Sequence, residues 1–455
     1  MNRDKLDFGN DKIGKLFRAM FFPTLIGMLF NSILNLCDGM FVGHGVGSDA
    51  LAAINIVAPV FLVCTGVGLM FGIGASVICG IRMAENNDKA ARIIATQAII
   101  AGAVTFALII AICLAFTRPV LYLLGCSPVL EGYATDYMLW LLPGLMFLYL
   151  ECAGMMLIRQ DGAPGFAMSI QVIAALLNII LDWLMVFPMG LGIKGAAIAT
   201  SISCGVGGVM VLAYFIFKAR VLRFYPLKLS AKSLMLSLRN VGYMIKLGFA
   251  TFIAEMAMGI MMVTGNYMFM SLLDEDGVAA FSIGCYLFPI LFSINNSVAQ
   301  SAQPIISYNF GSHNFARVRA VLDTSLLTAS ICGSLITIMM WLGAPWLVRI
   351  FLSPDVEAYT IALKGLPLLG LCAIFFALNI TFIGYYQSCE KAGRSILYML
   401  LRGVIFIVPL FNIMPRIIGV DGLWLALPAS ESLTLLVIVA IYLLQRRARR
   451  QAATL

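Results

Sequence analysis

Long stretches without a single charged residue recur along the whole chain. They cover residues 19–37, 50–81, 93–117, 195–217, 277–312, 324–348 and 365–389. Most exceed the roughly 20 apolar residues that a helix needs to cross the hydrocarbon of a bilayer, and the first nearly reaches that length. Their apolar residues run continuously, whereas the strands of outer-membrane barrels alternate apolar and polar positions. The pattern therefore predicts an all-α membrane protein.

The apolar stretches and their neighbours predict about twelve transmembrane helices. We expect these helices near 17–42, 52–79, 93–117, 133–157, 164–188, 193–217, 241–270, 277–307, 318–342, 356–386, 395–414 and 421–445. Composition agrees, because 61% of the residues are hydrophobic and only 11% are charged, against about 25% charged in soluble domains. A soluble fold is excluded.

The net charge of +8 raises the question of nucleic-acid binding, but the basic residues follow membrane topology instead. Counted by alternate loops, about 25 of the 30 Lys and Arg lie on the side that holds the N-terminus. This distribution predicts a multi-pass protein of the cell inner (plasma) membrane with both termini in the cytoplasm. We expect a monomer surrounded by membrane lipid, without a nucleic-acid partner.

The two halves of the chain resemble each other at an offset of about 227 residues. Leu51–Ile56 falls on Val278–Ile283, and Gly192–Gly195 falls on Gly419–Gly422. We therefore expect two six-helix lobes related by a pseudo-twofold axis along the membrane normal, a repeat typical of alternating-access transporters. The lobes would be 1–217 and 241–455, joined by the basic cytoplasmic linker 218–240.

Ionisable residues inside the predicted spans are functional candidates, because each costs roughly 2.5 to 3.5 kcal/mol to insert. Those of the first half are Asp38, Asp136, Glu151 and Asp182, and those of the second half are Glu255, Lys364, Arg402 and Glu431.

Distance from the helix ends places three oxygen-bearing side chains of the first half at one depth. At 1.5 Å per residue, Asp38, Asp182 and Thr200 share a layer near the outer surface. Asn178 lies four residues before Asp182 and therefore on the same helix face. Two carboxylates, an amide and a hydroxyl are ligands for Na⁺, and the carboxylates are also sites for a proton. The alternative is that the two acids only cap helix ends or bind neighbouring backbone.

The second half lacks these ligands at the corresponding positions. The offset pairs Asp182 with Pro409, Asn178 with Ile405, and Thr200 with Leu427. The second lobe has its own candidate polar site, whose members either form a structural ion pair or serve a second function. They are Glu255, Lys364, Arg402 and Glu431.

Other features limit the chemistry. Pro23 predicts a kink in the first helix below Asp38. Gly207-Gly208 predicts close helix packing. The eleven Cys show no paired spacing, and only two His are present, so we expect neither disulfides nor a zinc site. The sequence supports no enzymatic reaction. We expect no cofactor other than a coupling ion, because no domain able to hydrolyse a nucleotide is evident.

Several motifs resemble the multidrug and toxic compound extrusion (MATE) transporters over nearly the whole chain. They are Cys37–Gly43, Leu157–Gly162, Leu177–Asp182, Gly192–Thr200, Ala302–Gly311 and Gly422–Glu431. The resemblance implies a twelve-helix antiporter that expels cationic or amphipathic drugs against Na⁺ or H⁺. It also implies that the cation binds at positions matching Asp38, Asn178, Asp182 and Thr200. Some members carry an acidic pair in the second lobe, but the interior of the tenth helix here offers Lys364 and no carboxylate.

Two other functions remain open at the level of sequence. A lipid-linked oligosaccharide flippase of the same broad superfamily would share the two lobes, but it should line its cavity with basic residues, and Lys364 and Arg402 are only two. A channel or membrane receptor is less consistent with a half-length repeat that has an acidic pocket in one half only, because a channel needs a continuous polar path. The sequence identifies neither the substrate nor the coupling ion.

Overall fold

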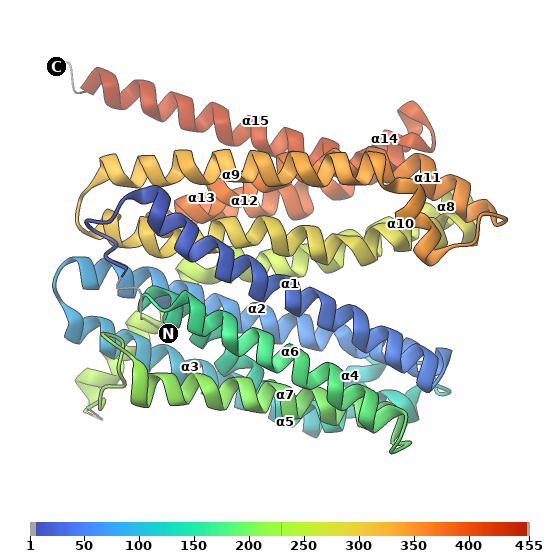
Figure 1. Ribbon diagram of the computed structural model, residues 1–455, viewed down its shortest axis with the longest axis horizontal. Helices are drawn as coiled ribbons and strands as arrows, with labels where there is room; N and C mark the ends of the chain where they lie inside the picture. Colours follow the sequence, from blue (N-terminus) through green and yellow to red (C-terminus); the bar gives the residue numbers. More distant parts are fainter. Residues whose placement is uncertain (1–5, 229, 453–455) are drawn as a thin grey trace. The chain divides into compact units, whose positions relative to one another are not determined.

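The computed structural model describes residues 6–228 and 230–452, which are almost entirely helical and contain no β-strand (Figure 1). Eleven of the described helices are long and apolar enough to cross a membrane. The predicted lobes and linker also include residues 1–5, 229 and 453–455, which lie outside the described residues.

The longest helix, α8, contains two of the predicted spans. It covers Ala231–Gly311, and its 81 residues far exceed a single crossing. Its backbone breaks at Asp274, where φ is 51° and ψ is −147°, in the acidic sequence between the spans predicted at 241–270 and 277–307. Counting its two parts separately gives the twelve spans expected. Helix α8 begins ten residues earlier than predicted, inside the expected linker.

The chain divides into two compact units. Unit 1 comprises the described residues up to Met256, with Gln303–Arg319 and Ser388–Ala392, and unit 2 comprises Ala257–Ala302, Ala320–Gln387 and the described residues from Gly393 onward. Helix α8 contributes to both. The lobe boundaries at 217 and 241 stay a prediction.

Unit 1 is a bundle of long helices (Figure 1). Helix α5 packs against α2, α3 and α7, while α6 packs against α1 and α7. The elements are α1 (Ile13–Gly45), α2 (Ser48–Ala84), α3 (Asp88–Ala115), α4 (Thr117–Leu123), α5 (Glu131–Gln160), α6 (Pro164–Val186), α7 (Gly192–Ala213) and the π-helix η1 (Tyr214–Lys218).

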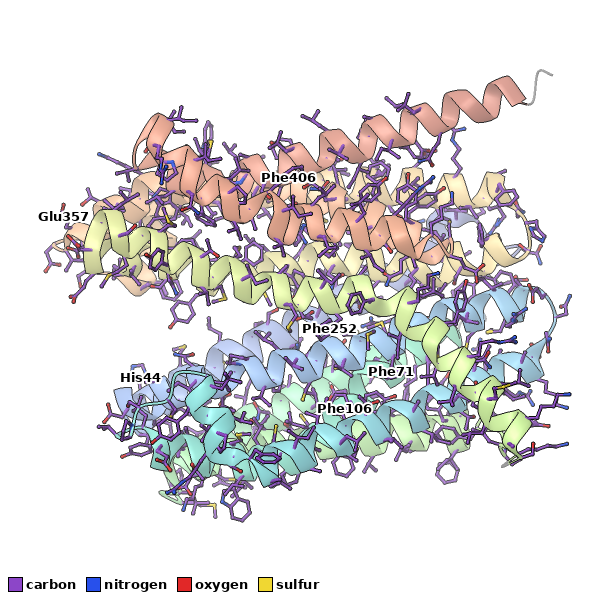
Figure 2. The ribbon with its side chains drawn as sticks, turned by 180° about the vertical axis from the view of Figure 1, so that it is seen from behind. His44, Phe71, Phe106, Phe252, Glu357 and Phe406 are labelled. Atoms are coloured by element: carbon purple, nitrogen blue, oxygen red, sulfur yellow. The ribbon has the colours of Figure 1, made fainter. Side chains whose placement is uncertain are left out.

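Helix α3 shows how the bundle separates its core from its apolar surface. Val104, Leu108 and Ile112 follow one another at four-residue spacing and are more than half exposed, as expected for a face turned toward lipid. Phe106 on the opposite face is fully buried. Its ring lies 4.9 Å from that of Tyr149 on α5, which also contacts Phe71 on α2, and both phenylalanines are labelled in Figure 2.

Two glycines allow α2 and the first part of α8 to cross at very short distance. A Cβ added to Gly74 would lie 2.1 Å from the carbonyl oxygen of Met244, and one added to Gly248 would lie 1.8 Å from that of Met70. Each glycine thus faces the backbone of the other helix one turn from the partner glycine. Because backbone cannot yield as a flexible side chain can, this crossing requires glycine at both positions.

We expect Gly248→Ala to destabilise unit 1 by more than about 1–3 kcal/mol, the usual cost of overpacking, because the clash is with backbone. Gly242→Ala is the matched control, since Gly242 lies on the same helix with no atom within 4 Å of an added Cβ. Thermal unfolding of the purified variants in detergent measures both. Equal midpoints for the two variants would contradict the close crossing.

Asp161 holds the segment after η1 against the end of α5. Its buried carboxylate accepts hydrogen bonds from the Tyr214 hydroxyl at 2.7 Å and from three consecutive backbone N–H groups. These belong to Arg220 at 2.7 Å, Val221 at 2.8 Å and Leu222 at 3.0 Å. One side chain therefore satisfies the backbone of an irregular segment that has no helix to do so.

We expect Asp161→Ala to cost about 3 kcal/mol or more, because hydrogen bonds to a charged group contribute about 1.5–3 kcal/mol and several buried donors would lose their acceptor. The midpoint of thermal unfolding reports the loss. Asp88→Ala provides a comparison at an exposed acidic position of the same unit. A midpoint close to that of wild type would show that the segment finds other partners.

Unit 2 is organised around a cluster of aromatic rings. The Phe269 ring of α8 lies 4.6 Å from Phe281 and 4.9 Å from Trp424, and Phe411 packs edge-on against Phe281. Besides its part of α8, the unit contains the described helices α9 (Phe315–Leu342, from Ala320), α10 (Ala344–Phe351), α11 (Glu357–Gly370), α12 (Cys372–Ser388), α13 (Ala392–Leu400), the π-helix η2 (Leu401–Ile405), α14 (Ile407–Ile418) and α15 (Asp421–Ala452).

Candidate functional site

The candidate cation site lies in unit 1, on three neighbouring helices. Asp38 comes from α1, Asn178 and Asp182 from α6, and Thr200 from α7. Helix α6 packs against both α1 and α7. Its side chains therefore lie near side chains of both neighbouring helices. Asn178 and Asp182 are fully buried, and Asp38 is partly buried near the end of α1, which His44 marks in Figure 2.

The Asn178 amide joins α6 to α7. Oriented so that both of its ends are satisfied, it donates a hydrogen bond to Asp182 Oδ2 at 3.0 Å and accepts one from the Thr200 backbone N–H at 3.2 Å. The Thr200 hydroxyl donates to the carbonyl oxygen of Ala196 at 3.0 Å. Three of the four predicted residues therefore form one connected set.

Asp38, the fourth predicted residue, is linked to the set by the interaction of its charge with that of Asp182. Its carboxyl lies close enough to that of Asp182 for the two to interact electrostatically. Each of them has one oxygen, Oδ1, that is buried and has no hydrogen-bond partner within the described residues. Two ionised carboxylates in such a place repel each other unless a proton or a cation lies between them. The arrangement is thus able to exchange one positive charge.

Tyr137 of α5 lies beside the two carboxylates of the candidate site, although no sequence pattern singles it out. It is buried, and its hydroxyl lies within electrostatic range of Asp38 and Asp182. Aromatic residues are common in any membrane core. Only the position of Tyr137 close to the two acids distinguishes it from the other aromatic residues. Asp136 beside it, a candidate by sequence, instead forms an exposed ion pair with Lys194 at 3.2 Å.

Pro23 lies inside α1, well before Asp38. Since proline has no N–H, it cannot donate the usual helical hydrogen bond to the carbonyl oxygen of Ala19. This is the place where the sequence predicts a bend, and its role in switching stays a prediction.

The second-half candidates do not form a single group. Arg402 of η2 makes a buried ion pair with Glu431 of α15, with Nη2 2.5 Å and Nε 3.0 Å from Oε1. Asn379 of α12 donates to Oε2 of the same carboxylate at 2.7 Å. The Arg402 guanidinium also lies over the Phe376 ring, 4.3 Å from its centre. Both oxygens of Glu431 are satisfied, which is the pattern of a structural ion pair.

The other two candidates lie elsewhere. Lys364 is exposed on α11. Glu255 is buried and belongs to unit 1, where its side chain lies beside Gly66 of α2. Glu255 thus falls in unit 1 although it lies in the second half of the sequence, because α8 passes from one unit into the other.

Comparison with known proteins identifies the family. The MatE family model matches residues 23–184 and 250–413. The chain belongs to the MATE family. It is a multi-pass membrane transporter and not an enzyme.

The chain is similar to known transporters and to solved MATE structures along nearly its full length. The chain is 24% identical over 426 residues to the multidrug export protein MepA of Staphylococcus saprophyticus, covering 93% of this chain and 92% of that protein. It is 29% identical over 449 residues to an FAD transporter of Shewanella oneidensis, covering 96% and 95%. A multidrug resistance MATE transporter solved in its outward-facing conformation is 19% identical, with a TM-score of 0.89 over 98% of each chain. The predicted fold class is confirmed.

Proposed function

We propose that this MATE transporter exports small cationic or amphipathic organic compounds in exchange for Na⁺ or H⁺. The observation that carries the proposal is the pair of carboxylates, Asp38 and Asp182, each with a buried oxygen that lacks a partner among the described residues. A site of this kind binds and releases a positive charge. The multidrug export name of the Staphylococcus relative supports the choice of substrate.

In the proposed cycle, the coupling ion enters from outside and binds between Asp38 and Asp182. Asn178 positions one carboxylate through its hydrogen bond, and Thr200 supplies a further oxygen nearby. Neutralising the acids removes their repulsion, which favours release of the organic cation and return to the inward-facing form. Each charge that moves inward across a potential of about 100 mV supplies about 2.3 kcal/mol, and export of a monovalent cation consumes the same amount. One coupling charge beyond the charge of the substrate therefore sustains a substrate gradient of about 50-fold.

Export of FAD is the second candidate, because the Shewanella relative bears that name at 29% identity. FAD is an anion and would need cationic side chains inside the membrane. Carboxylates dominate the membrane interior of unit 1 in its described part, and Arg402 of unit 2 is already neutralised by Glu431. The charges therefore favour a cationic substrate.

Membership of the family likewise favours a transporter over the flippase, channel or receptor left open by the sequence.

Efflux of ethidium from cells that express the full chain tests the proposal. We expect energised cells to expel the dye, and we expect either added Na⁺ or an imposed proton gradient to set the rate, which would identify the ion. Cells that retain ethidium under both gradients but expel FAD would replace this proposal with the second one. The proposal also includes cytoplasmic termini and a monomer in lipid, which protease accessibility and light scattering of the purified protein can check.

A further inference from the structure

Another acidic residue of unit 1, Glu151, has no role in the coupling set. It lies on α5 inside a membrane span and is partly buried. Within the described residues it makes neither an ion pair nor a hydrogen bond. A charge without a partner inside the membrane is expensive and is therefore a functional candidate.

The glycine pair of α7 fits around this region of α5. A Cβ added to Gly207 would lie 2.7 Å from Glu151 Oε2, and one added to Gly208 would lie 3.0 Å from the Phe147 ring. Phe147 precedes Glu151 by one helical turn, so the ring and the carboxylate share a face of α5. The close packing predicted for Gly207-Gly208 thus leaves room for an acid beside an aromatic ring.

Helical spacing places Glu151 on the cytoplasmic side of the coupling set. It follows Tyr137 by two heptads on α5, and Gly207 follows Thr200 by one heptad on α7, so both pairs lie on nearly the same helix face. These spacings correspond to about 10 to 20 Å along the helix axes. Cys204 lies between, within electrostatic range of both Tyr137 and Glu151.

The surroundings of Glu151 fit an organic cation better than a metal ion. Na⁺ requires several oxygen ligands, whereas the neighbours recorded for Glu151 are the thiols of Cys152 and Cys204, with Glu255 beyond Cys152. No group of three or more His, Cys, Asp or Glu able to hold a metal exists among the described residues. A lone carboxylate beside an aromatic ring and polarisable sulfur suits a bulky, weakly hydrated cation.

We propose that Glu151 binds the positive charge of the organic substrate, with Phe147 in contact with its apolar part. This inference rests on the proposed function. It assigns the coupling ion and the substrate cation to two different sites. The coupling ion binds at Asp38 and Asp182, and the substrate cation binds at Glu151.

Binding of tetraphenylphosphonium to the purified full-length protein tests the assignment. We expect Glu151→Gln to raise the Kd about 10-fold or more, the loss of one charge-assisted contact, and Glu151→Asp to retain most of the affinity. Glu131→Gln, at the first residue of the same helix, where Glu131 pairs with Arg118, should bind as wild type does. The Asp38→Asn/Asp182→Asn variant should keep its affinity, because the substrate carboxylate is intact.

A second measurement uses the wild-type protein alone. A carbodiimide that modifies carboxylates within membranes should label Glu151, and tetraphenylphosphonium should protect it, as read by mass spectrometry of the α5 peptide. Unchanged affinity in Glu151→Gln, or labelling of Glu151 that the cation does not reduce, overturns this inference and leaves the antiport proposal standing. If wild type binds the cation through Glu151 but shows no ion-driven efflux, only the antiport proposal fails.

Discussion

Neutralising either acid of the coupling set, by Asp38→Asn or Asp182→Asn, should abolish ion-driven export of ethidium. The asparagine side chain keeps the shape of aspartate but cannot take up a proton or balance Na⁺. Without a coupling charge, no ion gradient drives export, so cells that express either variant should retain as much ethidium as cells that lack the transporter. Efflux from energised cells, measured at matched expression, gives the result.

Asp136→Asn is the control for that experiment. Asp136 is also an acid in the outer part of unit 1, but it is exposed and paired with Lys194, so its variant should transport nearly as wild type does. If the Asp38 and Asp182 variants were as active as this control, the coupling set would be wrong. Glu255, a buried acid of the same unit, would then be the next residue to test.

Removing one partner of the buried pair in unit 2 should have the largest effect on stability. We expect Arg402→Met to cost about 3–5 kcal/mol, because Glu431 would remain as an uncompensated buried charge. The double variant Arg402→Met/Glu431→Gln should recover much of this loss, since no charge is then left without a partner. Thermal unfolding in detergent, followed by size-exclusion chromatography, compares the variants.

Arg416→Met serves as the matched control, because Arg416 is exposed on α14 and should tolerate loss of its charge. If Arg402→Met were as stable as this control but lost transport, the ion pair would be functional rather than structural. That result would revive the second-half site that the sequence left open.

The two halves differ in how they keep polar groups in the membrane. In unit 2 the Arg402 guanidinium and the Asn379 amide satisfy both oxygens of Glu431. In unit 1, Asp38 and Asp182 each keep one buried oxygen that has no partner among the described residues. A satisfied network fixes one conformation, whereas an unsatisfied one changes its free energy when a ligand arrives. Ligand binding is therefore expected in unit 1.

The sequence by itself determined the spans and predicted a common depth for the site residues. Each membrane helix must bury about 20 apolar residues and satisfy its backbone internally, so its existence depends little on its neighbours. Depth follows from the fixed rise per residue, which is why Asp38, Asp182 and Thr200 could be assigned to one layer. The family motifs led to the same residues.

Only the tertiary structure decided which side chains meet at a given depth. Rotation of a helix and the choice of its neighbours depend on packing against other helices, which no local pattern records. For this reason the sequence missed Tyr137 beside the acids and grouped Glu255 with Arg402. It likewise gave no sign that Gly74 and Gly248 cross. Contacts between residues far apart in the chain form only when the whole bundle closes, and the site depends on those contacts.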